Sequence, residues 1–155
     1  MPDEGGACML TYRLDNTLSC FGKVTRGICD VRDGVLHSIT ETYNVSRDES
    51  GRITGTSDGE ERVLAPDALA SMNIFGFTPW IFDRCHEEFT EFLRSDKSGT
   101  DRGELPVPMV LDRLIKNGSL KITATPTEAQ WFGVTYKEDR ELVRSKLLEM
   151  LGIAQ

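Results

Sequence analysis

The chain has 155 residues, of which 25 are acidic and 18 basic, so its formal net charge is −7. Apolar residues make up 39% of it, which suits one folded domain spanning residues 1–155 and excludes wholesale disorder. No run of about 18 apolar residues exists, and residues 1–10 lack the basic and apolar regions of a secretory signal. An acidic chain without a basic stripe is a poor candidate for nucleic-acid binding. We therefore expect a cytoplasmic protein that binds neither nucleic acid nor a membrane.

The first 40 residues are typical of β-structure. Strand-forming residues occupy 9–14, 25–31 and 35–40. The Asp33-Gly34 pair separates the second and third of these segments, and an Asp-Gly turn between two alternating runs predicts a β-hairpin.

The middle of the chain changes from polar to apolar. Residues 48–61 are polar and glycine-rich, which indicates a loop in which 52–54 pair only briefly. The apolar run 70–77 then predicts a strand that is buried on both faces. Pro79 ends this strand and is well placed to open a helix over 79–94, where apolar residues follow helical spacing.

The last third alternates helices and strands. Pro108 is placed in the first turn of a helix that ends at the Asn-Gly pair at 117–118. Strand-like segments follow at 120–124 and 131–135, and a last helix is expected over 137–151. This order predicts a mixed α/β fold, in which helices flank a partly antiparallel sheet.

The cysteines and histidines do not point to a catalytic centre. Cys8, Cys20, Cys29 and Cys85 form no Cys-x-x-Cys pair, and we expect free thiols. Cys85 is followed by His86, but adjacent residues on a helix do not face each other. No catalytic residue is predicted.

Two polar residues stand out for their positions. Glu104 lies in a charged turn directly before the helix that Pro108 opens. Its carboxylate either accepts hydrogen bonds from sugar hydroxyls or lies near the positive end of the helix dipole, and residue chemistry favours the second interpretation. Asn73 interrupts an apolar strand, so its amide needs partners from neighbouring backbone or from a ligand.

Several segments carry a resemblance to a known family. Tyr-Arg-Leu-Asp-Asn-Thr-Leu-Ser at 12–19, Ser-Met-Asn-Ile-Phe-Gly-Phe-Thr-Pro at 71–79 and Trp-Phe-Gly-Val-Thr-Tyr-Lys-Glu-Asp at 131–139 resemble three motifs of one nucleotidyltransferase group. The hairpin strand at 26–31 and Arg-Gly-Glu-Leu at 102–105 resemble elements of the C-terminal half of sugar-1-phosphate nucleotidyltransferases. The resemblance covers nearly the whole chain.

The resemblance implies a fold, a site and an incomplete enzyme. It implies the C-terminal half of the nucleotide-diphospho-sugar transferase fold, without the N-terminal half that holds the NTP. It assigns substrate-binding roles to Gly27, where the backbone approaches the sugar, and to Asn73 and Glu104, which meet sugar hydroxyls. Glu41 is the fourth substrate-binding residue that the resemblance implies. It occupies the Glu of a Glu-Lys-Pro element, but Thr42 stands where that element has its lysine.

The same resemblance limits what this chain does with metal. Mg²⁺ belongs to the complete enzyme, and we expect none bound by this chain alone. The second metal-binding position of the family is Gly133 here, which offers no side-chain ligand. Glu138 and Asp139 nearby are expected only to favour the positive end of the last helix. The isolated chain is therefore expected to release no pyrophosphate from an NTP.

Two functions stay open. In the first, the chain is the sugar-phosphate-binding half of a nucleotidyltransferase. Its partners are then a sugar phosphate or nucleotide-sugar and either an N-terminal half-domain or a second copy of the chain. In the second, it is a catalytically inactive binding or assembly module derived from that fold. A domain without any ligand is a weaker third interpretation. An upstream reading frame with a glycine-rich loop and an acidic pair would favour the first function.

Overall fold

The computed structural model describes residues 5–95, 103–134 and 136–152. It is a mixed α/β fold whose strands form one mixed sheet in the order β2-β6-β1-β7-β3-β4-β5. Only β1 and β7 pair in parallel among the described strands. The strands are β1 (Gly5–Arg13), β2 (Val24–Arg32), β3 (Val35–Arg47), β4 (Ile53–Ser57), β5 (Glu60–Leu64), β6 (Leu69–Phe77) and β7 (Leu120–Thr127).

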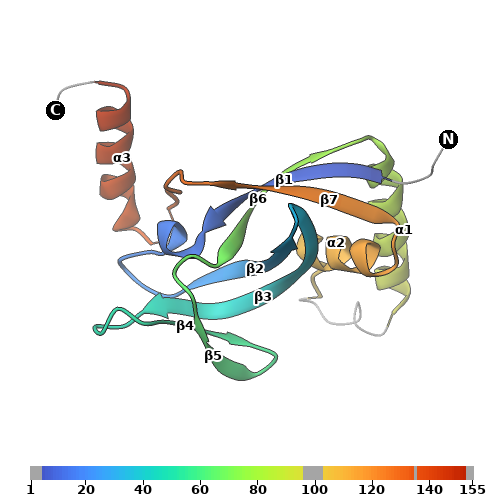
Figure 1. The fold of residues 1–155 in the computed structure, drawn as a ribbon, viewed down its shortest axis with the longest axis horizontal. Coiled ribbons are helices and arrows are strands. Elements are labelled where there is room, and N and C mark those ends of the chain that lie inside the picture. Colours follow the sequence, from blue (N-terminus) through green and yellow to red (C-terminus); the bar gives the residue numbers. More distant parts are fainter. Residues whose placement is uncertain (1–4, 96–102, 135, 153–155) are drawn as a thin grey trace.

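The sheet closes into a small barrel. Because β2 also pairs with β3, the strands β2, β6, β1, β7 and β3 form a ring, and the β4–β5 hairpin extends from β3 (Figure 1). No helix in the described part of the chain is long and apolar enough to cross a membrane.

Two tight turns with the same chemistry connect neighbouring strands. The predicted hairpin of β2 and β3 is confirmed, and its central residues Asp33 and Gly34 have φ of 51° and 74°. Asp58 and Gly59 repeat this geometry between β4 and β5, with φ of 53° and 79°. Positive φ at both central residues is what a type I′ turn requires. The prediction of a loop over 48–61 is therefore wrong, because this segment contains most of a second hairpin.

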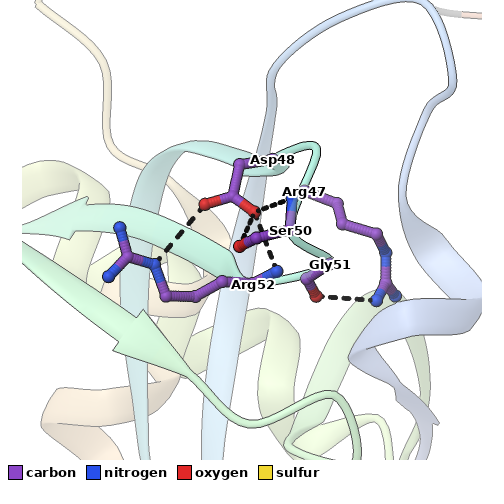
Figure 2. A network of polar contacts seen from close by, with 5 residues as sticks. All are labelled: Arg47, Asp48, Ser50, Gly51 and Arg52. Carbon is purple, nitrogen blue, oxygen red and sulfur yellow. Dashed lines mark hydrogen bonds and ion pairs between the residues drawn. The ribbon is translucent and has the colours of Figure 1, made fainter.

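Local polar contacts close the link between β3 and β4 (Figure 2). The Asp48 carboxylate accepts hydrogen bonds from the Ser50 hydroxyl at 2.6 Å and from the Ser50 and Arg52 backbone N–H groups at 2.9 Å. Arg47 donates to the Gly51 carbonyl at 3.1 Å. The hydrogen bond from Ser50, followed by that from Arg52, lowers the pKa of Asp48. Hydrogen bonds to the Asp48 carboxylate thus stabilise the conformation of this exposed loop.

The helices α1 (Trp80–Arg94) and α2 (Val107–Lys116) confirm the predicted helices in the middle of the chain. Pro79 directly precedes α1. α2 ends at Lys116, Asn117 is its C-cap, and Gly118 follows with φ of 77°. α2 packs against β3 and β7. The two helices and four strands share the larger apolar core, which contains Met9, Cys29, Leu36, Ile39, Ile81, Val110, Leu111, Leu114, Leu120, Ile122 and Ala124.

The opposite end of the barrel has its own core. The 3₁₀ helix η1 (Leu14–Thr17) lies there, and so does the start of the β4–β5 hairpin. This smaller core contains Leu14, Val24, Val45, Ile53 and Ala70. The last helix, α3 (Asp139–Met150), lies at this end of the molecule, far from α1 and α2 (Figure 1).

The prediction of a strand at 131–135 is wrong over 131–134. Residues 128–134 have no regular secondary structure, and position 135 lies outside the described residues. The Trp131 backbone N–H instead donates to the Asn16 carbonyl at 3.1 Å, which ties this segment to η1. The segment is strand-like in composition, yet no described strand pairs with it.

The strand β6 confirms the predicted strand at 70–77, but the predicted burial on both faces is wrong. Ala70 and Ser71 are buried, whereas Ile74 is 41% exposed. Pairing explains the difference, because β2 contacts β6 only at Leu69–Ser71. Beyond Ser71 the described part of the chain offers β6 a partner on one side only, and a cleft opens there.

Candidate functional site

A cleft of about 700 Å³ opens where β2 and β6 separate, beside the start of α2. Gly27, Glu41 and Asn73 all line it, so the structure brings together three of the four residues that the resemblance assigns to substrate. Whether they bind a ligand stays a prediction. The lining residues are Thr25, Arg26 and Gly27 of β2, Glu41 of β3, Ser71, Met72, Asn73, Phe75 and Phe77 of β6, Pro106, Val107 and Pro108 at α2, and Trp131.

Strand register aligns part of this lining in one row. Gly27 of β2 lies opposite Glu41 of β3 on one side and opposite Ser71 of β6 on the other. Side chains at directly opposed positions share a face of the sheet. Cys29 and Ile39 form the row two residues further along, and both belong to the larger core. The row that contains Glu41 is therefore the first polar row beyond the core.

Gly27 is buried, and it has a packing reason to be glycine. A Cβ atom at this position would lie 2.8 Å from the Ile39 Cγ2 atom and 3.5 Å from the Ser71 Cβ atom. The first distance is shorter than normal contacts between carbon atoms, so a larger residue would force the Ile39 side chain to shift. Close approach of a sugar, as the resemblance implies, is thus one of two reasons for glycine at this position.

Asn73 lies in a β-bulge that the sequence analysis did not anticipate. Met9 of β1 pairs with Phe75 and Thr11 pairs with Ser71, so one residue of β1 faces three residues of β6. Asn73 has φ of 58°, and its backbone N–H donates to the Ser71 hydroxyl oxygen at 3.2 Å. Left-handed backbone is uncommon outside glycine, although asparagine adopts it more readily than most residues.

The bulge exposes the Asn73 side chain instead of burying it. The expectation that this amide is buried within a strand is therefore wrong, and a ligand as its partner stays a prediction. Within the described part of the chain, the amide group makes no hydrogen bond and lies at the cleft. A polar residue within an apolar strand is the sequence signal that pointed to this position.

Glu41 is half-buried at the cleft and forms no ion pair with any residue that the structure describes. Its neighbour Thr42, which stands at the lysine position of the family, is buried. The Thr42 hydroxyl donates to the Thr40 carbonyl at 3.1 Å, so Thr42 adds no charge to the site.

Glu104 is exposed and is not among the cleft-lining residues, although Pro106 at the cleft rim follows two positions later. Arg102, the first residue of its motif, lies outside the described residues. The structure therefore sets Glu104 near the rim and apart from the other three predicted residues.

Arg26 is the residue of this site that the sequence analysis missed. It is only 8% exposed, and its Nε and Nη2 atoms donate to the Thr17 carbonyl, with Nε at 3.2 Å. Nε also reaches the Thr17 hydroxyl oxygen at 3.2 Å, and Nη1 donates to the Thr25 carbonyl at 2.8 Å. The guanidinium carbon lies 5.1 Å from the centre of the Trp131 ring. The sequence signal that could have identified Arg26 is a charged residue within a predicted strand.

Arg26 and Trp131 also line a second hollow of about 80 Å³, which lies next to α3. Asp139 and Lys146 of α3 line it as well. Asp139 is 4% exposed, and its carboxylate accepts hydrogen bonds from the Tyr136 backbone N–H at 2.7 Å and from Ser19. Asp139 therefore links the start of α3 to Ser19, in addition to the helix-dipole role expected from the sequence.

The residues near Gly133 do not fit the Mg²⁺ that the resemblance implies for the complete enzyme. A Cβ atom on Gly133 would collide with the Trp131 ring, so this position has no room for a carboxylate side chain. The two Asp139 carboxylate oxygens already accept protein hydrogen bonds. Among the described residues, no cluster of three or more His, Cys, Asp or Glu side chains is placed to hold a metal ion.

No protein-family model matches this chain, and no curated protein matches it.

Proposed function

We propose that this chain is the sugar-phosphate-binding half of a sugar-1-phosphate nucleotidyltransferase. Such an enzyme transfers a nucleotidyl group from an NTP to a sugar 1-phosphate. The observation that supports the proposal is the convergence of Gly27, Glu41 and Asn73 on one cleft from three separate strands. The C-terminal half of the nucleotide-diphospho-sugar transferase fold and a cytoplasmic location belong to the same proposal.

The cleft has the chemistry that a sugar needs. The Glu41 carboxylate accepts hydrogen bonds from hydroxyl groups, and the Asn73 amide both donates and accepts them. Phe75 and Phe77 line the same cleft, with ring centroids 5.4 Å apart, and offer an apolar wall to the face of a sugar ring. The volume also lies within the range of small-molecule sites.

The NTP side of the reaction is assigned to a partner. That partner is an N-terminal half-domain or a second copy of the chain. No residue of this chain is given a catalytic role. Its part is to bind and orient the sugar phosphate so that its phosphate oxygen meets the α-phosphorus of the NTP.

Calorimetric titration of the whole chain with a panel of sugar 1-phosphates and nucleotide-sugars tests the proposal. Loss of a charge-assisted hydrogen bond in Glu41→Gln should weaken binding about ten- to a hundredfold. Glu61→Gln is the matched control, because Glu61 is an exposed carboxylate on β5, outside the cleft. Absence of binding across the panel, or equal affinity in Glu41→Gln and wild type, would refute the proposal.

The second candidate, a catalytically inactive binding or assembly module, is favoured by exposed apolar residues on α1. Phe82 is 75% exposed and Phe89 is 49% exposed, and they lie two turns apart on the helix. Light scattering on the chain and on a Phe82→Ser/Phe89→Ser variant tests this function. A dimer that the double substitution dissociates, in a chain that binds no member of the sugar panel, would favour the module over the enzyme half.

A further inference from the structure

A buried positive charge lies beside the cleft without a carboxylate partner. Arg26 is 8% exposed, and no acidic side chain in the described part of the chain forms an ion pair with it. The chain carries a net charge of −7, so acidic groups are plentiful elsewhere. Arginine is almost never fully buried unless it is paired, because removing its charge from water is costly. Burial accordingly lowers the pKa of Arg26.

The hydrogen bonds of Arg26 leave part of its guanidinium available. A guanidinium has five N–H donors. Protein acceptors within the described residues take the Nε proton and one proton on each terminal nitrogen. One N–H on Nη1 and one on Nη2 therefore remain for another acceptor. The terminal nitrogens of arginine match two oxygens of a phosphate in a paired arrangement.

Trp131 and Thr17 hold this donor pair in position. The Trp131 ring covers a face of the guanidinium at 5.1 Å, and Thr17 accepts hydrogen bonds along one edge. Stacking of this kind leaves the edges of the guanidinium plane free to donate. Arg26 and Trp131 line both the cleft and the small hollow beside α3, so they form the wall between these two spaces.

We propose that Arg26 binds the phosphate group of the cleft ligand, with Trp131 as the platform that orients its guanidinium. Glu41, on the same cleft, carries the opposite charge and would repel a phosphate, so the phosphate lies at the Arg26 end and the hydroxyls lie toward Glu41. The sugar part of this ligand rests on the proposed function, whereas the phosphate part rests on the environment of Arg26. Thr42, opposite Arg26 in the strand register, supplies no charge, so Arg26 takes the role of phosphate-binding cation.

Titration with inorganic phosphate at constant ionic strength tests the inference without a sugar. Calorimetry gives the affinity, and the emission of Trp131 in a Trp80→Phe variant, which retains one of the two tryptophans, reports binding at this position. Arg26→Gln should weaken phosphate binding about ten- to a hundredfold. Arg26→Lys keeps the charge but not the paired donors, and should weaken it several-fold.

Arg84 provides the matched control. Its guanidinium carbon lies 5.4 Å from the centre of the Trp80 ring, but its charge is paired with Glu87 at 2.8 Å. Arg84→Gln should therefore leave phosphate affinity unchanged. Urea midpoints check that each variant folds, and if Arg26→Gln does not fold, Arg26→Lys decides.

Unchanged phosphate affinity in a folded Arg26 variant, or phosphate binding that leaves the Trp131 emission unaltered, would overturn the inference. The proposed function fails separately. If phosphate binding depends on Arg26 but no sugar 1-phosphate binds more tightly than phosphate, the sugar-binding function is refuted and the phosphate site stands. Sugar 1-phosphate binding that is indifferent to Arg26 would keep the function and remove this inference.

Discussion

The left-handed conformation of Asn73 gives a prediction that separates backbone strain from ligand binding. At φ of 58°, an ordinary L-residue loses about 1–2 kcal/mol relative to its preferred conformations, and asparagine loses less. Glycine avoids this cost but loses about 0.5–1 kcal/mol through the greater freedom of the unfolded chain. We therefore expect Asn73→Gly to unfold within about 0.5 kcal/mol of wild type and Asn73→Ala to be about 1 kcal/mol less stable.

Both variants lack the side-chain amide, so both should lose affinity for sugar 1-phosphates to the same extent. A neutral hydrogen bond contributes about 0.5–1.5 kcal/mol, which corresponds to a loss of roughly two- to tenfold. Urea denaturation gives the stabilities, and calorimetric titration gives the affinities. The expected result is a shared loss of affinity with different stabilities.

Asn44 is the matched control for this pair of variants. It has φ of 54°, is exposed on β3 and does not line the cleft. Asn44→Gly and Asn44→Ala should reproduce the stability difference without changing affinity. Equal stabilities of Asn73→Gly and Asn73→Ala would refute the strain argument, and wild-type affinity in Asn73→Gly would remove the amide from the site.

Three further predictions concern the core, a thiol and a loop. Leu111 of α2 is fully buried, so Leu111→Ala should lower the free energy of unfolding by about 2–5 kcal/mol in urea titration, and a loss below this range would contradict tight packing. Burial raises the pKa of Cys29 to about 12, so an alkylating reagent at neutral pH should label the exposed Cys8 and spare Cys29 until the chain unfolds. The Ser50 hydrogen bond lowers the pKa of Asp48, so the β3–β4 loop gains stability above the ordinary aspartate pKa of about 3.9 and loses it as pH falls through the lowered value. The backbone amide shifts of that loop should follow this transition, and Asp48→Asn should abolish it.

Sequence patterns predicted the elements whose signals are local. The Asp-Gly turn before β3, the proline before α1 and the Asn-Gly stop after α2 each depend on the backbone preferences of one or two residues. The same rule predicts the β4–β5 turn at Asp58-Gly59. The low apolar content of 48–61 indicates a loop, whereas the turn residues indicate the hairpin that the structure contains.

The features that could not be predicted depend on distant partners. Strand-like composition does not create a strand at 131–134, because pairing needs a neighbouring strand and Trp131 contacts η1 and Arg26 instead. The burial of β6 depends on where β2 leaves it, which no local pattern encodes. The bulge at Asn73 follows from the register between β1 and β6. The resemblance therefore singled out three residues that line the cleft, but the sequence did not predict the shape of the cleft.

We expect Asp139 to contribute to stability and Glu104 to contribute to ligand affinity. Asp139 is 4% exposed, and its carboxylate accepts hydrogen bonds from the Tyr136 N–H and the Ser19 hydroxyl, so Asp139→Asn should cost about 1.5–3 kcal/mol of stability. This exceeds the few tenths of a kcal/mol that a dipole interaction alone would give. Glu104 is exposed and does not line the cleft, but it lies two residues before the cleft-lining Pro106, and the resemblance assigns it to sugar hydroxyls. On that assignment, Glu104→Gln should leave the urea midpoint unchanged while weakening sugar 1-phosphate binding about tenfold. Urea titration and calorimetry on both variants measure the two effects. Affinity that survives Glu104→Gln and collapses in a folded Asp139→Asn would move the binding site from the cleft rim to the hollow beside α3.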